Sequence, residues 1–454
     1  MDTLTVGVDI GTTSVKALAV NDGGAVVASA RMRHRLITGA GRLEHDADEA
    51  WRRNVWTVYN EVAAGRHIRA GVIAAMVPSL TAVDGEGLPR GPGLLYGDVR
   101  GQGLPGASPA ASGEAGGFLG WLAANVPNVA GFWPAQAVGT HALCNRPAID
   151  YATAFCTSPL FDGRDWSADA LRDAGAEPRQ LPRVVTELEP VGRIVDGEAA
   201  VGPGTVDALA AQYVAGADQP GDVLVVLGAT MIVWLVADGW VECPGLWTVP
   251  YTVPGTCLVG GASNAGGLFV DWVRGLVADT GVDAADALDP HDIPLWLPYV
   301  RGERTPLHQP RLRGELGDVH VGHGTDAVLR AAHEASAFVL RRVLELADAT
   351  TPADLAPQRI VAVGGGVRNR RWVGALADGT GLPVAVAEVP DASALGAAFV
   401  ARCVAGLEGD PTDGRRWART ARVREPDPRW LVACDERYER FVQRTLALVE
   451  ELED

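Results

Sequence analysis

Residues 4–32 read LTVGVDIGTTSVKALAVNDGGAVVASARM. Apolar residues alternate with small or polar ones as far as Ile10, the segment GTTS makes a tight turn, and VKALAV runs back. A second turn at residues 21–24, Asn-Asp-Gly-Gly, leads into another apolar run. This pattern predicts three antiparallel strands. A helix is predicted to follow, with Asp46 as its N-cap and a buried side formed by Ala50, Trp51, Val55, Val58, Tyr59 and Val62.

The strand–turn–strand pattern recurs at residues 222–242, DVLVVLGATMIVWLVADGWVE. Aligning Gly11 with Gly228 places Thr13 on Thr230, more than two hundred residues away. Such a distance favours a duplicated domain over a solenoid, whose repeats are far shorter. Gly-x-Thr hairpins also recur by chance, so the repeat alone does not decide between duplication and coincidence.

A third glycine turn lies within residues 359–388, RIVAVGGGVRNRRWVGALADGTGLPVAVAE. It predicts a strand, a Gly-Gly-Gly turn, a helix over residues 369–377 and a further strand. A helix of very small residues is expected from Ser393, which suits close packing against a neighbour. A final helix is expected over residues 434–451, and we interpret it as packing on the second domain.

The size and composition restrict the class of protein. A chain of 454 residues favours two domains. Its net charge of −17 argues against nucleic acid or an anionic membrane as partner. No run approaches 18 apolar residues, and the N-terminus carries no signal-like segment, so a cytoplasmic protein is expected. The six cysteines are scattered without a CxxC pair, which predicts reduced, buried thiols.

Only the first hairpin carries charged side chains beside its glycine turn, because its Asp9 and Lys16 align with Val226 and Val233 of the second copy. Lys16 is the only lysine among 39 basic residues. An ammonium group is favoured over a guanidinium where one phosphate oxygen must be met in little space, so Lys16 is a candidate phosphate ligand. Asp9 is placed to hold hydrated Mg²⁺. Taken alone, Asp9 fits a turn-capping aspartate better.

Asp207 lies in VGPGTVDALAAQYVAGA, where a loop rich in glycine and proline runs into a predicted helix. An aspartate at a helix N-terminus is commonly only a favourable partner of the helix dipole. The same carboxylate can also accept a hydroxyl proton, and phosphoryl transfer needs no more than a modest base. Both interpretations stay open at this point.

Taken together, these motifs resemble the FGGY carbohydrate kinase family, and most nearly its xylulokinase-like members. The likeness covers nearly the whole chain. Its segments are DIGTTSVKALAVN from residue 9, EHDADEAW at 44–51, GDVR at 97–100, GPGTVDALAA at 202–211, LGAT at 227–230, LPYVRGERTP at 297–306, GGGVRNRRW at 364–372 and SALGAAF at 393–399. Several matches in order are far more specific than any one of them.

The resemblance implies an α/β protein of two actin/Hsp70-like (ribonuclease H-like) domains flanking an ATP cleft. We place an N-terminal FGGY domain at residues 1–239, with the sugar site and the first phosphate hairpin. An adenine-binding C-terminal domain is placed at 240–454. The implied cofactors are ATP and Mg²⁺, and the substrate is a small sugar or polyol. The sequence does not fix the oligomeric state, and a homodimer is compatible with it.

The same resemblance implies a role for individual residues. Asp207 matches the catalytic base, Asp9 the metal-associated aspartate, and Asp98 and Arg100 the substrate-side pair. The ATP-binding positions are Gly11, Thr12, Thr13 and Lys16 in the first loop, Gly228 and Thr230 in the second, and Gly365, Gly366 and Asn369 beside the adenine.

Two departures from the xylulokinase pattern fall on sugar recognition. The Gln-Met-His positions are Met76, Val77 and Pro78 here, and the Asp-Asn pair is Asp207-Ala208. The expectation is retained chemistry with a changed substrate pocket that includes Val77, Pro78 and Asp207. Two alternatives stay open: a non-catalytic actin-like regulator or chaperone ATPase, and a pseudokinase that binds a sugar and signals.

Overall fold

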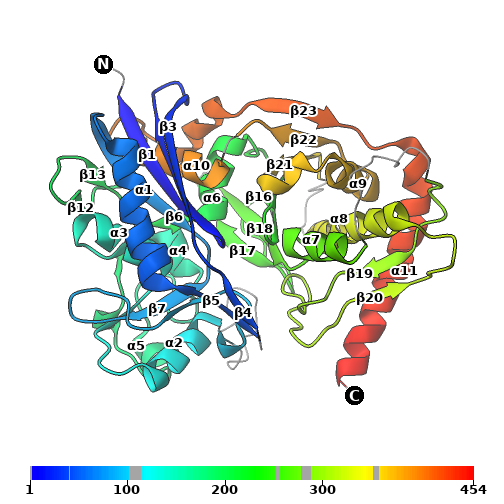
Figure 1. Ribbon diagram of the computed structural model, residues 1–454, viewed down its shortest axis with the longest axis horizontal. Helices are drawn as coiled ribbons and strands as arrows, with labels where there is room; N and C mark the ends of the chain where they lie inside the picture. The colour runs from blue at the N-terminus through cyan, green and yellow to red at the C-terminus, as the bar shows by residue number, and fades with distance from the viewer. Residues whose placement is uncertain are drawn as a thin grey trace. The chain divides into compact units, whose positions relative to one another are not determined.

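The computed structural model describes residues 3–39, 41–101, 114–251, 255–277, 288–350, 357–389 and 391–453. The chain forms two compact units. The first contains residues 1–216 and 389–418, and the second contains residues 217–388 and 419–454. Figure 1 shows the elements of both units.

The first unit is built on a seven-stranded sheet in which β1 is central. Its strand order is β12 (Gly192–Arg193), β13 (Ala200–Val201), β6 (Ile68–Ala75), β1 (Leu4–Ile10), β2 (Ser14–Val20) and β3 (Val26–Arg33), with β14 (Thr205–Val206) also paired to β6. Strands β1, β2 and β3 are antiparallel neighbours, as the sequence predicts. Strand β6 runs parallel to β1 and to β14.

Smaller sheets and seven helices among the described residues complete this unit. The smaller sheets are β4 (Ile37–Gly39), β5 (Arg42–Asp46), β8 (Pro92–Leu95), β7 (Ser79–Val83) and β9 (Gly131–Trp133), and the pair β10 (Ala148–Asp150) and β11 (Arg183–Val185). The helices are α1 (Asn54–Ala63), α2 (Glu114–Asn125), α3 (Ala135–Cys144), α4 (Tyr151–Phe155), α5 (Ala168–Asp173), α6 (Asp207–Ala215) and α10 (Ala392–Val404). A π-helical turn precedes α1, and the predicted buried side of this segment is confirmed.

The alternation along β1 separates two covered faces of the sheet. Val6, Val8 and Ile10 lie in a hydrophobic core with residues of α1. The odd-numbered residues face α10, because the Thr5 hydroxyl donates a hydrogen bond of 2.8 Å to the carbonyl of Ala398. Asp9 belongs to this second face, since side chains alternate along a strand. The register therefore directs Asp9 towards the side of the sheet that α10 covers.

Helix α10 packs closely on β1 and α6, as its small residues predict. A Cβ atom at Gly7 would lie 1.9 Å from the carbonyl oxygen of Ala394. A Cβ atom at Gly396 would lie 1.7 Å from the carbonyl oxygen of Ala210 in α6. Glycine at these positions lets the backbones touch, and the close contact holds α6, which begins at Asp207.

Gly396→Ala is expected to destabilise the first unit by ~2 kcal/mol, because the added methyl group meets backbone rather than a movable side chain. Gly409→Ala is the matched control, since a Cβ atom at Gly409 would meet nothing within 4 Å. Denaturant titration of both variants measures the difference. Equal unfolding midpoints for Gly396→Ala and the wild type would contradict the close α6–α10 contact.

The second unit has its own seven-stranded sheet. The strand order is β17 (Trp247–Pro250), β18 (Thr256–Ser263), β16 (Met231–Asp238), β15 (Asp222–Leu227), β21 (Arg359–Val363), β22 (Val384–Ala387) and β23 (Thr420–Arg424). Strands β19 (Leu295–Leu297) and β20 (Glu315–Gly317) form a separate pair, and the helices are α7 (Gly267–Leu276), α8 (Thr325–Thr350), α9 (Arg370–Thr380) and α11 (Pro428–Glu453).

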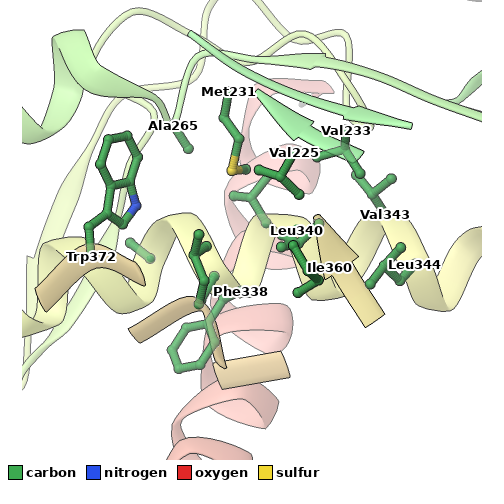
Figure 2. Close-up of a cluster of buried hydrophobic side chains, with 14 of the residues drawn as sticks. Val225, Met231, Val233, Ala265, Phe338, Leu340, Val343, Leu344, Ile360 and Trp372 are labelled. Atoms are coloured by element: carbon green, nitrogen blue, oxygen red, sulfur yellow. The ribbon is translucent and has the colours of Figure 1, made fainter. Parts of the chain in front are cut away.

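A hydrophobic core joins α8 to one face of this second sheet. Figure 2 shows Phe338, Leu340 and Val343 of this core together with Val225 and Val233. The C-terminal helix α11 packs on α8 and α9, as predicted, although it begins six residues earlier than expected. Apolar spacing along the final helix would place Leu446 on its buried side, but this residue is 48% exposed. Thr445 is buried in its place and bonds to Tyr299.

The predicted repeat has the same topology in both units. In each, the first strand of the glycine hairpin is antiparallel to the second and parallel to a later strand. The loops differ by one residue, because Ile10 pairs with Val15 whereas Leu227 pairs with Met231. An ungapped alignment is therefore out of register after the glycine turn, and Lys16 corresponds to Ile232 rather than to Val233. The shared topology nevertheless supports duplication over coincidence.

The two compact units do not coincide with the predicted domains, 1–239 and 240–454. Strand β15 bonds to β21 within the second sheet, so the second glycine hairpin belongs to the second unit from residue 217 onward. Residues 389–418 belong to the first unit, because α10 packs there on α6 and β1. The predicted domain boundaries themselves stay a prediction about the family's two domains.

Two expectations from composition also have structural counterparts. Among the described residues, no helix is long and apolar enough to span a membrane. All six cysteines are buried free thiols, as predicted.

Candidate active site

Three adjacent parallel strands of the first unit end at the same edge of the sheet. Ile10 of β1 pairs with Ala75 of β6, and Val206 of β14 pairs with the same Ala75. The next residues along the chain are Gly11, Met76 and Asp207. In α/β proteins, ligands bind beyond the carboxyl ends of such strands. The register thus brings the first glycine hairpin, the segment Met76-Val77-Pro78 and Asp207 to one edge of the sheet. We call Met76-Val77-Pro78 the altered substrate segment.

Lys16 makes two ion pairs at this edge. It lies directly opposite Asp9 in the antiparallel pair, with its Nζ atom 3.9 Å from the Asp9 Oδ2 atom. The same Nζ atom is 2.9 Å from Oδ1 of Asp391, the residue before α10. Asp391 carries no signal in the sequence for this contact. An aspartate before a helix suggests an N-cap, but this side chain makes no capping hydrogen bond and pairs with Lys16 instead.

Asp9 is buried among other charged groups. Burial raises the pKa of its carboxyl to about 7. The Lys16 ammonium opposes this shift, and the charges of Asp207 and Asp391 add to it. A carboxylate that is buried near two others gains from a hard cation, and carboxylate oxygens are the ligands that Mg²⁺ prefers. The donor set around Asp9 therefore fits the predicted magnesium ion.

Asp207 is the first residue of α6 and is half-buried. Its Oδ1 atom accepts a hydrogen bond of 2.7 Å from the backbone N–H of Ala208. The positive end of the helix dipole stabilises a carboxylate at this position. The side chain is therefore suited to be charged at the strand edge, where it can accept a proton from a bound hydroxyl.

A buried hydrogen-bond chain supports the first glycine hairpin. The indole N–H of Trp51 donates to His45 Nδ1 at 3.0 Å, so His45 Nε2 carries the proton and donates to the carbonyl of Thr12 at 2.8 Å. Burial lowers the pKa of His45 to about 4, which keeps the imidazole neutral. Both residues belong to the EHDADEAW segment, for which sequence reasoning gave no role. In this structure the segment holds the hairpin.

Tyr96 connects the hairpin to the altered substrate segment. Its hydroxyl lies 2.9 Å from the hydroxyl of Thr12, and its backbone N–H donates to the carbonyl of Pro78 at 3.1 Å. Pro78 is buried and Val77 is half-buried. The sequence gave no signal for Tyr96, because its two contacts join segments distant in the chain.

Asp98 and Arg100 are brought together but are largely occupied by each other. Asp98 is fully buried, and its carboxylate accepts hydrogen bonds from the guanidinium of Arg100 and the backbone N–H of Leu43. Arg100 also pairs with Glu44 and lies 4.7 Å from the ring centroid of Trp121. This arrangement fixes the local fold, and direct substrate contact by Asp98 stays a prediction.

The second unit places its glycine turns at one sheet edge in the same way. Val226 of β15 pairs with Val363 of β21, so the turn at Gly228 and the turn at residues 364–366 leave neighbouring parallel strand ends. The backbone N–H of Gly267 donates to the carbonyl of Gly228 at 2.9 Å, which ties this hairpin to α7. Thr230, at the end of the hairpin, is buried.

Asn369 caps α9, as the predicted start of that helix requires. Its Oδ1 atom accepts a hydrogen bond of 3.1 Å from the backbone N–H of Trp372. Its Nδ2 atom lies 3.1 Å from His333 Nε2. Gly365 is exposed and Gly366 is partly exposed, so the backbone of this turn is open to a ligand.

The LPYVRGERTP segment has a structural role in the second unit. Glu303 is buried, and its carboxylate accepts hydrogen bonds from the Ser263 hydroxyl and the backbone N–H of Asn264 at 2.9 and 2.8 Å. Burial raises the pKa of this carboxyl to about 7. The segment therefore anchors the loop that connects β18 to α7.

Comparison with known proteins finds carbohydrate kinases over nearly the whole chain. Residues 223–405 match the model for the C-terminal domain of the FGGY family of carbohydrate kinases. A xylulose kinase of Streptomyces rubiginosus is 29% identical over 460 residues, covering 92% of this chain and 91% of that protein. These matches support an FGGY carbohydrate kinase, with the C-terminal domain of that family at residues 223–405. A gluconokinase of Bacillus subtilis (strain 168) is 25% identical over 462 residues, covering 90% of this kinase and 88% of that protein.

A solved structure confirms the predicted fold class of this chain. The xylulose kinase from Rhodospirillum rubrum superposes with a TM-score of 0.83 at 24% identity, covering 99% of this chain and all of that one. The predicted α/β architecture of two actin-like, ribonuclease H-like domains is therefore correct.

The single lysine of this chain allows a direct test of its environment. Amine-directed reagents can modify only Lys16 and the α-amino group. ATP with Mg²⁺ is expected to protect Lys16 strongly, because a phosphate-bound ammonium is both charged and covered. Mass spectrometry of the labelled peptide measures protection, and Lys16→Arg serves as the unlabelled control. Equal labelling of Lys16 with and without saturating nucleotide would remove it from the phosphate site.

Proposed function

We propose that this kinase transfers the γ-phosphoryl group of ATP to a hydroxyl of a small sugar, polyol or related compound, with Asp207 as the general base. The supporting observation is the shared sheet edge, where Asp207 follows β14 and the Asp9–Lys16 pair flanks the hairpin after β1. A base and a phosphate-binding hairpin at the ends of the two strands that flank β6 suit an in-line transfer to an alcohol.

In this proposal the first hairpin binds phosphate through its backbone and Lys16. The N–H groups of a glycine turn suit phosphate oxygens. The Lys16 ammonium leaves its ion pair with Asp391 and pairs with a phosphate oxygen instead. Asp207 accepts the proton of the substrate hydroxyl while that oxygen forms the new bond to phosphorus. The bond from the γ-phosphorus to the β,γ-bridging oxygen of ATP breaks in the same step, and ADP leaves with that oxygen.

Magnesium would be held near Asp9, where it would neutralise charge on the phosphate oxygens. The remaining nucleotide contacts are assigned to the second unit. Gly228 and Thr230 are proposed to bind phosphate, and Gly365, Gly366 and Asn369 to line the adenine site. The open turn backbone at residues 364–366 supports this assignment.

The substrate wall is proposed to be less polar than that of a xylulokinase. Val77, Pro78 and Ala208 have no side-chain donor or acceptor where the family pattern carries histidine and asparagine. Ala208 is 3% exposed. The preferred substrate is therefore expected to lack hydroxyls at this wall, to place an apolar group there or to reach it through water. Asp98 and Arg100 remain candidates for its opposite, polar end.

The regulatory alternatives are not favoured, because the relatives that align over about nine-tenths of the chain are kinases. Cytoplasmic location and a homodimer stay predictions.

A coupled assay of ADP release across ketoses, polyols, sugar acids and cyclitols tests the proposed function. Saturable stimulation by one structural class is expected, and that class identifies the substrate. ATP binding without stimulation by any compound of the panel would instead support a sugar-binding or regulatory protein.

A further inference from the structure

A cavity of about 360 Å³ lies in the second unit. Helices α8 and α9, strand β23 and Leu288 supply its described lining residues, which do not include Gly365, Gly366 or Asn369. The volume is in the range of pockets that bind small molecules. The cavity is thus separate from the residues assigned to ATP, and nothing in the proposed reaction uses it.

Arginines dominate the wall of this cavity. Five of its eleven described lining residues are arginines: Arg330, Arg370, Arg371, Arg422 and Arg424. In the whole chain all basic residues together number only 39 of 454, and the net charge is −17. A positive cluster in so acidic a protein is not explained by composition.

Two of the five arginines are neutralised within the fold. Arg330 is buried and pairs with Glu334 at 2.7 Å and Asp378 at 2.9 Å. Arg371 pairs with Asp326 at 3.1 Å. These two side chains shape the wall, but they add little net charge to it.

The other three arginines keep their charge available. Within the described part of the chain, Arg370, Arg422 and Arg424 form no ion pair. Arg422 donates one hydrogen bond of 2.6 Å to the carbonyl of Val367, which fixes its direction. Arg370 begins α9 and Arg424 ends β23, so the charges approach the cavity from different elements.

We propose that this pocket binds a phosphorylated small metabolite, of about the size of a sugar phosphate. Guanidinium groups match phosphate oxygens with paired N–H donors, which makes arginine the preferred residue for such anions. Three charges around one concave site suit a multivalent anion better than a single chloride. The acidic remainder of the surface disfavours a nucleic-acid partner.

The cavity adjoins Asn369, which is proposed to line the adenine site, so binding to the cavity must be measured separately from binding to the ATP site. His333 lines the cavity and its Nε2 atom lies 3.1 Å from Asn369 Nδ2. A phosphorylated probe could also enter the proposed phosphate loops. Titrations are therefore made on enzyme saturated with magnesium and a non-hydrolysable ATP analogue, which blocks the proposed phosphate loops, and the arginine variants distinguish this cavity from the sugar site.

Isothermal titration of inorganic phosphate and of ribose 5-phosphate into this complex tests the proposal. One site is expected, and its affinity should fall at least tenfold in the double variant Arg370→Glu/Arg424→Glu, since each charge-assisted hydrogen bond contributes strongly. Arg419→Glu is the matched control, because Arg419 is exposed in the same segment but does not line the cavity.

Three outcomes would overturn the proposal: no binding to the saturated enzyme, unchanged affinity in the double variant, or an equal loss in Arg419→Glu. Circular dichroism confirms that the variants are folded. Because heat of binding is measured without turnover, this test can fail while the proposed kinase activity stands. Equally, the enzyme can bind phosphate in this cavity even if the proposed kinase activity is not found.

Discussion

Asp207→Asn is expected to lower the turnover number of phosphoryl transfer by about 10²-fold or more, the range for a lost general base. Nucleotide affinity should change little, because Asp207 begins α6 at the substrate side of the strand edge and is not assigned to ATP. Asparagine preserves the size of the side chain and can still accept a hydrogen bond from the N–H of Ala208. The substitution therefore removes the proton acceptor while retaining its surroundings.

Steady-state ADP release and nucleotide titration of the same preparation separate the two effects. Asp173→Asn is the matched control, since Asp173 is an exposed aspartate at the end of a helix in the same unit. It should behave as the wild type. Turnover of Asp207→Asn within a few-fold of the wild type would exclude Asp207 as the base.

D-Xylulose is expected to be a poor substrate, by about 10²-fold or more in kcat/KM relative to the preferred compound. A hydroxyl buried without a partner costs roughly 1–3 kcal/mol, and two such contacts are lost, where Pro78 replaces histidine and Ala208 replaces asparagine. Pro78 also lacks a backbone N–H, so main-chain recognition is altered.

The measurement compares kcat/KM for D-xylulose with that for deoxy-sugars, short polyols and sugar acids. The double variant Pro78→His/Ala208→Asn restores both polar groups of the family pattern and should raise the relative efficiency with D-xylulose. If D-xylulose is already the best substrate of the wild type, the pocket has been misinterpreted and an ordinary xylulokinase assignment follows.

Local patterns predicted most of the elements that carry the site. The first hairpin, the buried face of α1 and the small-residue helix α10 follow from periodicity and residue size alone. Asp391 could not be found in this way, because its contact with Lys16 joins residues 375 positions apart and needs the packing of α10 on β1. The same packing decides which compact unit contains residues 389–418.

The polar contacts were harder to predict than the elements. Asp98 and Arg100 were expected at the substrate, and the structure shows that they bond to each other beside Glu44. His45 and Trp51 were visible only as part of a motif, since the hydrogen bond that gives them a role reaches the backbone of Thr12. Sequence periodicity reports burial, but it does not report which polar partner a buried group finds.

The most direct test of the account is mass spectrometry of the alcohol that stimulates ADP release most strongly. Wild-type enzyme with ATP and Mg²⁺ is expected to add one phosphoryl group to that alcohol for each ADP formed, and Asp207→Asn to form almost none in the same time. ADP released without a phosphorylated alcohol would show that water, not a sugar or polyol, accepts the phosphoryl group, and would contradict the proposed function.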